Sequence, residues 1–183
     1  TVWVSQPLID AAIAPLRDRV QLLATDTVTA WSPQQIAERL ASVDGAIITL
    51  NERIGAAQVA DAAQLQVIAN VGVGYNNLDV DALSAAGILA SNTPDVLTET
   101  TADLGFALLM ATARRITESE RWLREGQWGQ WSFQTMLGAD IHGSTLGILG
   151  MGRIGQGVAR RGALGFGMKV LYHNRSRLPA ETE

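Results

Sequence analysis

The chain has 183 residues, of which 47% are hydrophobic and 17% are charged, and its formal net charge is −4. This composition excludes an intrinsically disordered chain, because the apolar side chains are numerous enough to offset the entropy lost on ordering. The absence of cysteine excludes disulfide scaffolds, thiolate metal sites and cysteine nucleophiles, and with only two histidines we expect no metal site.

The first half of the chain alternates short apolar segments with alanine-rich segments, a pattern typical of a parallel sheet with crossover helices. We expect strands at Thr1–Val4, Val20–Ala24, Gly45–Leu50, Leu65–Asn70 and Ile88–Ala90. We expect helices near Leu8–Arg17, from Pro33 to about Ala41 with Ser32 as the N-cap, near Ala56–Ala62, and over Asp79–Ala86. Five strands with intervening helices predict a flavodoxin-like unit that ends near Pro94.

The next segment, from Thr98 to Glu125, has one glycine and no proline and predicts a single continuous helix. At 1.5 Å per residue this helix would be about 40 Å long, with Thr98 capping its start and Gly126 following its end. Its first half is apolar on nearly all sides, which indicates burial against more than one neighbour. A homodimer interface would explain this pattern, and so would packing between two domains of one chain.

Ten of the 18 glycines fall within residues 138–167. In this region a predicted strand at Thr145–Leu149 leads into the sequence GMGRIG at 150–155. A helix to about Gly162 and a second strand at Lys169–His173 follow. A GxGxxG motif between a strand and a helix, in a unit of this length, predicts a dinucleotide-binding βαβ unit that begins a doubly wound Rossmann sheet. The same glycines could also form a turn that binds no ligand.

Each glycine of this motif has an expected role. Gly150 permits the tight turn off the strand, Gly152 lets the backbone approach a pyrophosphate, and Gly155 lets the helix pack against the strand. The N–H groups and the positive dipole at the helix start would then bind the phosphates. The expected cofactor-binding residues here are Gly150, Met151, Gly152, Arg153, Ile154 and Gly155.

The segment after the second strand indicates which dinucleotide binds. An NAD site usually places Asp or Glu about 20 residues beyond the start of the motif. Here the residues at that place are Asn174, Arg175, Ser176 and Arg177. No carboxylate occurs before Glu181, and residues 141–183 carry six Lys and Arg against two Glu. A carboxylate would repel a 2′-phosphate, whereas arginine and serine can donate hydrogen bonds to it, so we expect NADPH rather than NADH. The two arginines could also belong to a solvated turn.

A second glycine pair, Gly72 and Gly74, lies after the fourth strand in the sequence NVGVGY at 70–75. Ligands bind at the carboxyl ends of strands in open α/β sheets. Closely spaced glycines there leave backbone N–H groups that can surround a small anion such as a carboxylate. The pair by itself is also typical of a tight turn.

Taken together, these motifs resemble the D-isomer-specific 2-hydroxyacid dehydrogenases, and most closely their glyoxylate/hydroxypyruvate reductase branch. The resemblance extends from about Asn70 to Pro179. It rests on VGVGYNNLD at 71–79, NTPDVLTETTADLGFALLMATARR at 92–115, Trp128 and Trp131, and LGILGMGRIGQGVARR at 146–161.

The resemblance implies a flavodoxin-like substrate domain at 1–96, an NAD(P)-binding Rossmann domain at 97–183, and an active site in the cleft between them. It implies hydride transfer from NADPH to a small 2-oxo acid such as glyoxylate or hydroxypyruvate. Val73 and Gly74 would bind the substrate carboxylate through their N–H groups, and Thr101 would face the cofactor. The long helix would contribute to a homodimer.

The resemblance also implies that this chain carries no catalytic residue. The family's catalytic arginine, its acid/base histidine and the carboxylate that orients this histidine would all follow Glu183. His142 and His173 are expected to be surface or cap residues. A doubly wound sheet needs about six strands, and only two are expected after Gly143. We therefore expect the N-terminal portion of a reductase, with its Rossmann domain truncated after the second strand and no activity of its own.

Two other functions fit the same motifs. A dinucleotide-sensing regulator of the corepressor kind would bind the cofactor without turning it over. An NAD-linked relative such as a phosphoglycerate dehydrogenase would use the other dinucleotide, but the missing acidic residue near His173 argues against it.

The overall sequence pattern indicates the setting in which the protein works. No apolar run approaches the ~20 residues of a membrane-spanning helix, and no signal-peptide pattern follows Thr1. An acidic chain is a poor partner for nucleic acid. We therefore expect a cytoplasmic enzyme that acts on small molecules.

Overall fold

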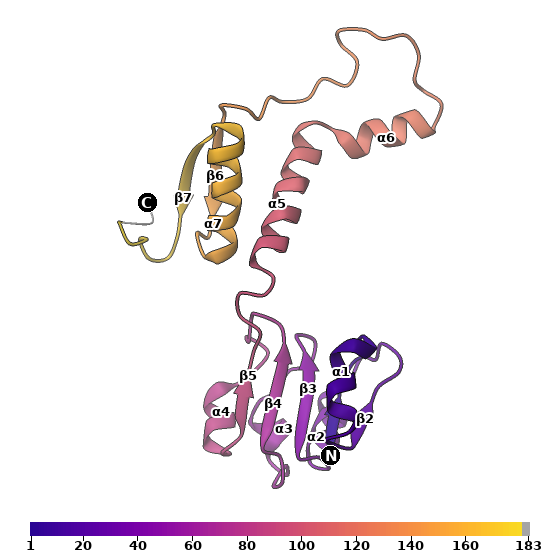
Figure 1. Cartoon of the computed structure of the whole chain (residues 1–183), viewed down its shortest axis with the longest axis vertical. Coiled ribbons are helices and arrows are strands. Elements are labelled where there is room, and N and C mark those ends of the chain that lie inside the picture. The colour runs from indigo at the N-terminus through magenta and orange to yellow at the C-terminus, as the bar shows by residue number, and fades with distance from the viewer. Residues whose placement is uncertain (181–183) are drawn as a thin grey trace. The chain divides into compact units, whose positions relative to one another are not determined.

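The computed structural model describes residues 1–180, and the chain divides into two compact units (Figure 1). The first unit comprises residues 1–94, and the second begins at Asp95. The first contains a five-stranded sheet, and the second contains a pair of strands preceded by two helices. None of the helices within residues 1–180 is long and apolar enough to cross a membrane.

The first unit is built on five parallel strands, which are β1 (Val2–Val4), β2 (Leu22–Ala24), β3 (Gly45–Thr49), β4 (Val67–Val71) and β5 (Leu89–Ser91). Their spatial order is β2-β1-β3-β4-β5, which is the flavodoxin-like order. The intervening helices are α1 (Asp10–Arg17), α2 (Pro33–Leu40), α3 (Ala56–Val59) and α4 (Val80–Ala85). The predicted α/β class and the five-stranded parallel sheet are confirmed.

The core of this unit is formed by apolar side chains of the strands that pack against the helices. Trp3 on β1, Ile48 on β3 and Ile68 on β4 are fully buried. They belong to one hydrophobic cluster with Leu40 of α2 and Leu83 of α4. The central strands therefore have a rigid support, and the loops at their carboxyl ends are anchored to it.

The second unit contains α5 (Thr98–Ala113), α6 (Ile116–Arg124), β6 (Thr145–Leu149), α7 (Arg153–Arg160), a π-helix (Arg161–Gly165) and β7 (Lys169–His173). β6 and β7 are parallel neighbours, paired from Thr145 with Lys169 to Leu149 with His173. The strand–helix–strand unit expected around the glycine motif is therefore present.

The prediction of a single helix over 98–125 is wrong, because the helix is interrupted between α5 and α6 (Figure 1). Arg115 adopts a left-handed conformation with a φ of 54°, and its guanidinium donates to the carbonyl of Leu137. The carbonyl of Ala113, which a continuing helix would use, accepts instead from the N–H of Ala139 at 2.8 Å. The segment after α6 therefore returns to the end of α5 and terminates it.

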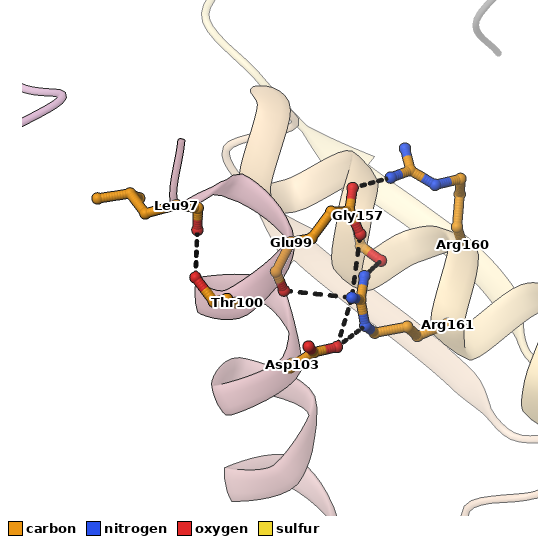
Figure 2. Close-up of polar contacts among 7 residues, drawn as sticks. All are labelled: Leu97, Glu99, Thr100, Asp103, Gly157, Arg160 and Arg161. Atoms are coloured by element: carbon orange, nitrogen blue, oxygen red, sulfur yellow. Dashed lines mark hydrogen bonds and ion pairs between the residues drawn. The ribbon is translucent and has the colours of Figure 1, made fainter. Parts of the chain in front are cut away.

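The start and the surface of α5 also differ from the expectation. Thr98 is the first helical residue rather than the cap, and the preceding residue, Leu97, has no side chain capping the helix. The hydroxyl of Thr100 donates back to the carbonyl of Leu97 at 3.2 Å (Figure 2). Within the described part of the second unit, α5 is not buried on nearly all sides, since Leu104 and Leu108 are 60% and 59% exposed.

α5 and α7 cross closely because small residues lie at their contact. A Cβ added to Gly157 of α7 would lie 2.8 Å from the Cβ of Ala102 on α5, which is too close for two carbon atoms. A Cβ added to Gly105 would lie 3.6 Å from Cγ2 of Val158, an ordinary contact. The crossing point is therefore at Gly157.

Arginines at the end of α7 and in the π-helix hold this crossing together (Figure 2). Arg161 donates to the carboxylate of Asp103 at 2.8 Å and to the carbonyl of Glu99 at 3.2 Å, both on α5. The same guanidinium donates to the carbonyl of Gly157 at 2.8 Å. Arg160 forms a further ion pair with Glu99 at 2.5 Å. These contacts fix α5 to the helix that begins at the glycine motif.

We expect Gly157→Ala to destabilise the second unit, because the added methyl group would force α5 and α7 apart at the crossing point. Overpacking of this kind costs about 1–3 kcal/mol. Gly105→Ala is the matched control, since it meets only an ordinary contact and alanine favours a helix by up to about 1 kcal/mol over glycine. Urea unfolding followed by circular dichroism measures both, and a Gly157→Ala protein as stable as the parent would contradict the close crossing.

Candidate functional site

The turn after β6 starts at Gly150, whose φ of 94° lies in the left-handed region that favours glycine. The N–H of Gly150 donates to the carbonyl of His173 at 2.9 Å, so the turn is tied to the end of β7. The structure therefore contains the tight turn expected at this position.

The three glycines of the motif differ in what surrounds them. A Cβ on Gly155 would lie 2.2 Å from the carbonyl oxygen of Gly150, so only glycine lets α7 start this close to the end of β6. A Cβ on Gly150 or Gly152 would meet no atom within 4 Å. The side chain of Met151 is buried, which leaves only its backbone available to a ligand. Gly155 thus serves packing, whereas Gly150 and Gly152 adjoin open space.

The start of α7 carries no side-chain cap, and Gly152 is its N-cap residue. The N–H groups of Arg153, Ile154 and Gly155 have no partner within the helix, because they belong to its first turn. They also form the positive end of the helix dipole. The side chain of Arg153 pairs with Asp95, with 2.7 Å between Nε and Oδ1. This helix start is suited to bind an anion.

The turn after β7 lies at the same edge of the strand pair as the glycine motif, because β6 and β7 are parallel and Gly150 is bonded to His173. Asn174 folds this turn by donating to the carbonyl of Ser176 at 3.0 Å. The exposed side chains of this turn are Arg175, Ser176 and Arg177. The two groups of residues selected from the sequence therefore meet at one edge. Glu181, the first carboxylate after this turn, lies outside the described residues.

Three other predicted positions are less informative. Thr101 is half-buried on α5, next to the residue that meets α7 at the crossing point, and its place in a cofactor site stays a prediction. His142 and His173 are exposed, which fits the surface role expected for them.

The second candidate site is the loop after β4 in the first unit, where three successive carbonyls are held from within that unit. The Gly72 carbonyl accepts from the N–H of Thr93 at 2.9 Å. The Val73 carbonyl accepts from Nδ2 of Asn92 at 2.8 Å. Thr93 and Asn92 directly follow β5, so the neighbouring strand supplies both donors.

The third carbonyl of this loop, that of Gly74, accepts from Nδ2 of Asn70 at 2.9 Å. The peptide bonds described are trans, and in a planar trans peptide the N–H points opposite to the carbonyl. The N–H groups of residues 73–75 therefore point away from the backbone and side-chain donors that hold the loop. Successive N–H groups presented in this way form a nest for a small anion.

A pocket opens beside this loop and is lined by Leu50, Arg53, Gly74, Asn76 and Asn77. Leu50 covers Gly72, where an added Cβ would lie 2.6 Å from Cδ2 of the leucine. A Cβ on Gly74 would meet no atom within 4 Å. The loop is thus packed at its first glycine and open at its second.

Glu52 is a buried carboxylate next to the same loop, only 1% exposed. It accepts hydrogen bonds from Oγ of Ser5 at 2.8 Å, from Nε2 of Gln6 at 2.7 Å, and from the N–H and hydroxyl of Thr49 at 2.8 and 2.9 Å. Burial raises the pKa of Glu52, but the hydrogen bonds from Gln6, Thr49 and Ser5 together lower it more, so its pKa lies below the ordinary value. Glu52 is therefore a fixed negative charge in the fold.

Val73 and Gly74 are predicted from the sequence, but the side chains that hold their carbonyls are not. Asn70 lies one residue before the end of the otherwise apolar strand β4, and Asn92 follows the neighbouring strand β5. Polar residues at the carboxyl ends of two adjacent parallel strands are a readable signal, because those ends meet at one edge of the sheet. The partners of these residues are not readable from the sequence.

Comparison with known proteins gives a consistent set of relatives. Residues 106–183 match the family model described as D-isomer specific 2-hydroxyacid dehydrogenase, NAD binding domain. A glyoxylate reductase of Thermococcus onnurineus is 40% identical over 183 residues, covering 97% of this chain and 54% of the relative. One of Korarchaeum cryptofilum is 43% identical over 177 residues, covering 96% and 53%.

A solved structure agrees over nearly the whole chain. The TT0316 protein from Thermus thermophilus matches with a TM-score of 0.88 at 42% identity, covering 97% of this chain and 57% of that one. The chain thus spans about half the length of the curated relatives it matches.

We expect Gly155→Ala to destabilise the second unit, because the new methyl group would collide with the backbone carbonyl of Gly150 rather than with a movable side chain. The expected loss is at least about 1–3 kcal/mol, the usual range for overpacking. Gly147→Ala on β6 is the control, since its Cβ would meet no atom within 4 Å. Thermal unfolding of both variants makes the measurement, and equal midpoints would show that the helix start is not fixed against the turn.

Replacement of Glu52 by glutamine should lower the free energy of unfolding at neutral pH by about 2 kcal/mol, since hydrogen bonds to a charged group are lost. The folded-state pKa of Glu52 is lowered, so its stabilisation is complete above the unfolded value of about 4.3 and is lost as the pH falls through the folded value. The gap between the parent and Glu52→Gln should therefore be constant from neutral pH down to about pH 5 and narrow in more acidic buffer.

Urea unfolding across this pH range makes the comparison. Glu38→Gln is the control for the change of side chain, because Glu38 is exposed on α2. A gap between the parent and Glu52→Gln that widens on acidification would contradict the ionised, hydrogen-bonded state of Glu52.

Proposed function

Because the chain belongs to the D-isomer-specific 2-hydroxyacid dehydrogenase family, we propose that the full-length protein reduces a small 2-oxo acid such as glyoxylate or hydroxypyruvate. The observation that carries the proposal is the uncapped start of α7 beside two glycines that adjoin open space. A backbone surface of this kind binds the pyrophosphate of a dinucleotide. The relatives at about 40% identity support the substrate class, because they are glyoxylate reductases.

A nicotinamide dinucleotide, when bound, supplies the hydride that reduces the 2-oxo carbon. In this proposal the N–H groups of Arg153 and Ile154, with the open backbone at Gly150 to Gly152, hold the pyrophosphate. Thr101 faces the same dinucleotide from α5. The side chain of Arg153 is exposed and pairs with the exposed carboxylate of Asp95. In this proposal the guanidinium exchanges that carboxylate for a cofactor phosphate.

The adenosine end of the cofactor is assigned to the turn after β7. The donors proposed for a 2′-phosphate are Asn174, Arg175, Ser176 and Arg177. The exposure of Arg175 and its place at the edge that carries the glycine motif support this assignment. Arginine also suits bidentate phosphate contact. NADPH is therefore the proposed cofactor.

The substrate carboxylate is assigned to the N–H groups of Val73 and Gly74. The held carbonyls of this loop support the assignment, since they turn the N–H groups to the opposite side. No residue of this chain is assigned as the proton donor, because the family resemblance places the acid/base histidine, its carboxylate partner and the catalytic arginine after Glu183.

The full-length protein is further proposed to be a homodimer that uses the helices after Thr98. The exposure of Leu104 and Leu108 on the side of α5 that does not meet α7 supports this assembly. Large apolar side chains that are exposed one turn apart on a helix are suited to contact with a partner.

The full-length protein should oxidise NADPH when glyoxylate is added, and Arg175→Asp should shift the ratio of kcat/KM for NADPH over NADH toward NADH by about tenfold or more. The physical reason is loss of a charge-assisted hydrogen bond to the 2′-phosphate and its replacement by a repelling charge. Steady-state kinetics with both dinucleotides measure this ratio. Arg19→Asp, at an exposed arginine of the first unit, is the control for the change of charge.

Three outcomes decide between the candidate functions. A clear preference of the unaltered protein for NADH would contradict the assignment of the turn after β7. Cofactor binding without turnover of any 2-oxo acid would favour a dinucleotide-sensing regulator. Turnover with NADPH that becomes NADH-linked in Arg175→Asp would support the proposal.

A further inference from the structure

The side-chain amides of two asparagines in the first unit donate hydrogen bonds to backbone carbonyls of the loop after β4. Nδ2 of Asn92 donates to the Val73 carbonyl at 2.8 Å, and Nδ2 of Asn70 donates to the Gly74 carbonyl at 2.9 Å. The two asparagines come from neighbouring parallel strands, Asn70 from β4 and Asn92 from just after β5. Adjacent peptide groups of the loop are therefore held by separate side chains.

The inner asparagine is itself part of a buried polar chain. Asn70 and Asn77 are 2% and 9% exposed, and Nδ2 of Asn77 donates to Oδ1 of Asn70 at 3.2 Å. The same Nδ2 donates to the carbonyls of Glu52 at 3.0 Å and Thr49 at 3.2 Å. Burial of an amide without hydrogen bonds destabilises the fold. The amides of Asn70 and Asn77 are hydrogen-bonded to each other and to backbone carbonyls.

The other end of this polar chain is fixed to the sheet. The carboxylate of Glu52 is held by Ser5 and Gln6, which follow β1, and by Thr49 at the end of β3. The same segment supplies the backbone carbonyls of Thr49 and Glu52 that accept from Asn77, so the Asn70 amide is oriented through Asn77 by main-chain groups at and just after the end of β3. Asn92, which is only half-buried, acts on the loop directly.

We propose that Asn92 and Asn70 are positioning residues for the substrate carboxylate. Asn92 holds the Val73 carbonyl and so turns away from itself the N–H of Gly74, which is one of the two proposed carboxylate donors. Asn70 holds the Gly74 carbonyl and in the same way orients the N–H of Tyr75, a third donor that this inference adds to the two already proposed. A Cβ on Gly74 meets no atom within 4 Å, so a carboxylate has room to approach there. This inference rests on the proposed function, since it assigns the residues that prepare its substrate loop.

A positioning role differs from a purely structural one in what it changes. Loss of the Asn92 amide would free one peptide group to rotate, so the N–H donors would no longer be oriented before the substrate binds. A net hydrogen bond contributes about 0.5–1.5 kcal/mol, so the loss should weaken carboxylate binding about three- to tenfold. The pyrophosphate site belongs to the second unit and should be unaffected.

The test uses the full-length protein and the variants Asn92→Ala and Asn70→Ala, with glyoxylate as substrate and oxalate as a carboxylate that cannot be reduced. We expect the KM for glyoxylate and the inhibition constant of oxalate to rise together, about three- to tenfold. The kcat at saturating glyoxylate and the dissociation constant of NADPH should stay within about twofold, because no group of the chemistry or the cofactor site is removed. Gln64→Ala removes an exposed amide that precedes β4 and is the control with unchanged constants.

The outcomes separate this inference from the function on which it rests. If the unaltered protein does not reduce glyoxylate, the proposed function fails and the inference fails with it. If the unaltered protein is active but Asn92→Ala binds glyoxylate and oxalate as before, the function stands and the positioning role is overturned. Asn70 is buried, so Asn70→Ala could fail to fold, and the half-buried Asn92 then decides the matter alone.

Discussion

The close approach of α7 to the end of β6 is the constraint on which the second unit depends. The Gly150 carbonyl lies where a Cβ of Gly155 would be, so the helix can start directly at the turn. Because the helix starts there, its first N–H groups reach the carboxyl edge of the strands without a capping side chain between them and solvent. The hydrogen bond from Gly150 to His173 then sets the turn after β7 beside them. The close contact of Gly155 with Gly150 and the hydrogen bond from Gly150 to His173 thus place the two groups of candidate residues together.

The first unit presents backbone donors by a different route. There the loop after β4 is irregular. Its N–H groups are oriented because Thr93, Asn92 and Asn70 hold the carbonyls of the same peptide groups. These polar groups can be buried because each of them is hydrogen-bonded, and this includes the ionised carboxylate of Glu52. In both units the proposed anion sites consist of main-chain N–H groups at strand ends. The helix dipole strengthens them in one unit, and a polar network orients them in the other.

Much of this arrangement could be predicted from local sequence patterns. The β-branched runs predicted the parallel strands, the Ser32-Pro33 pair predicted a capped helix, and the glycine spacing predicted the turn at Gly150. The break at Arg115 could not be predicted, because it depends on Ala139 taking the Ala113 carbonyl from across an irregular connection. Helix propensity depends only on the residues of the helix itself. The end of α5, in contrast, is set by a hydrogen bond from Ala139, which lies outside the helix.

A recognition surface made of main-chain N–H groups has a consequence for how such a protein can diverge. Replacement of Val73 by another residue would leave the donors of the loop in place, since every residue except proline has an N–H. If the loop binds a carboxylate as proposed, substitutions at the contact itself would keep the donors, whereas loss of Asn70 or Asn92 would remove the groups that hold the loop. On the same proposal, selectivity for one acid over another would depend on the side chains around the loop, such as Leu50 over Gly72.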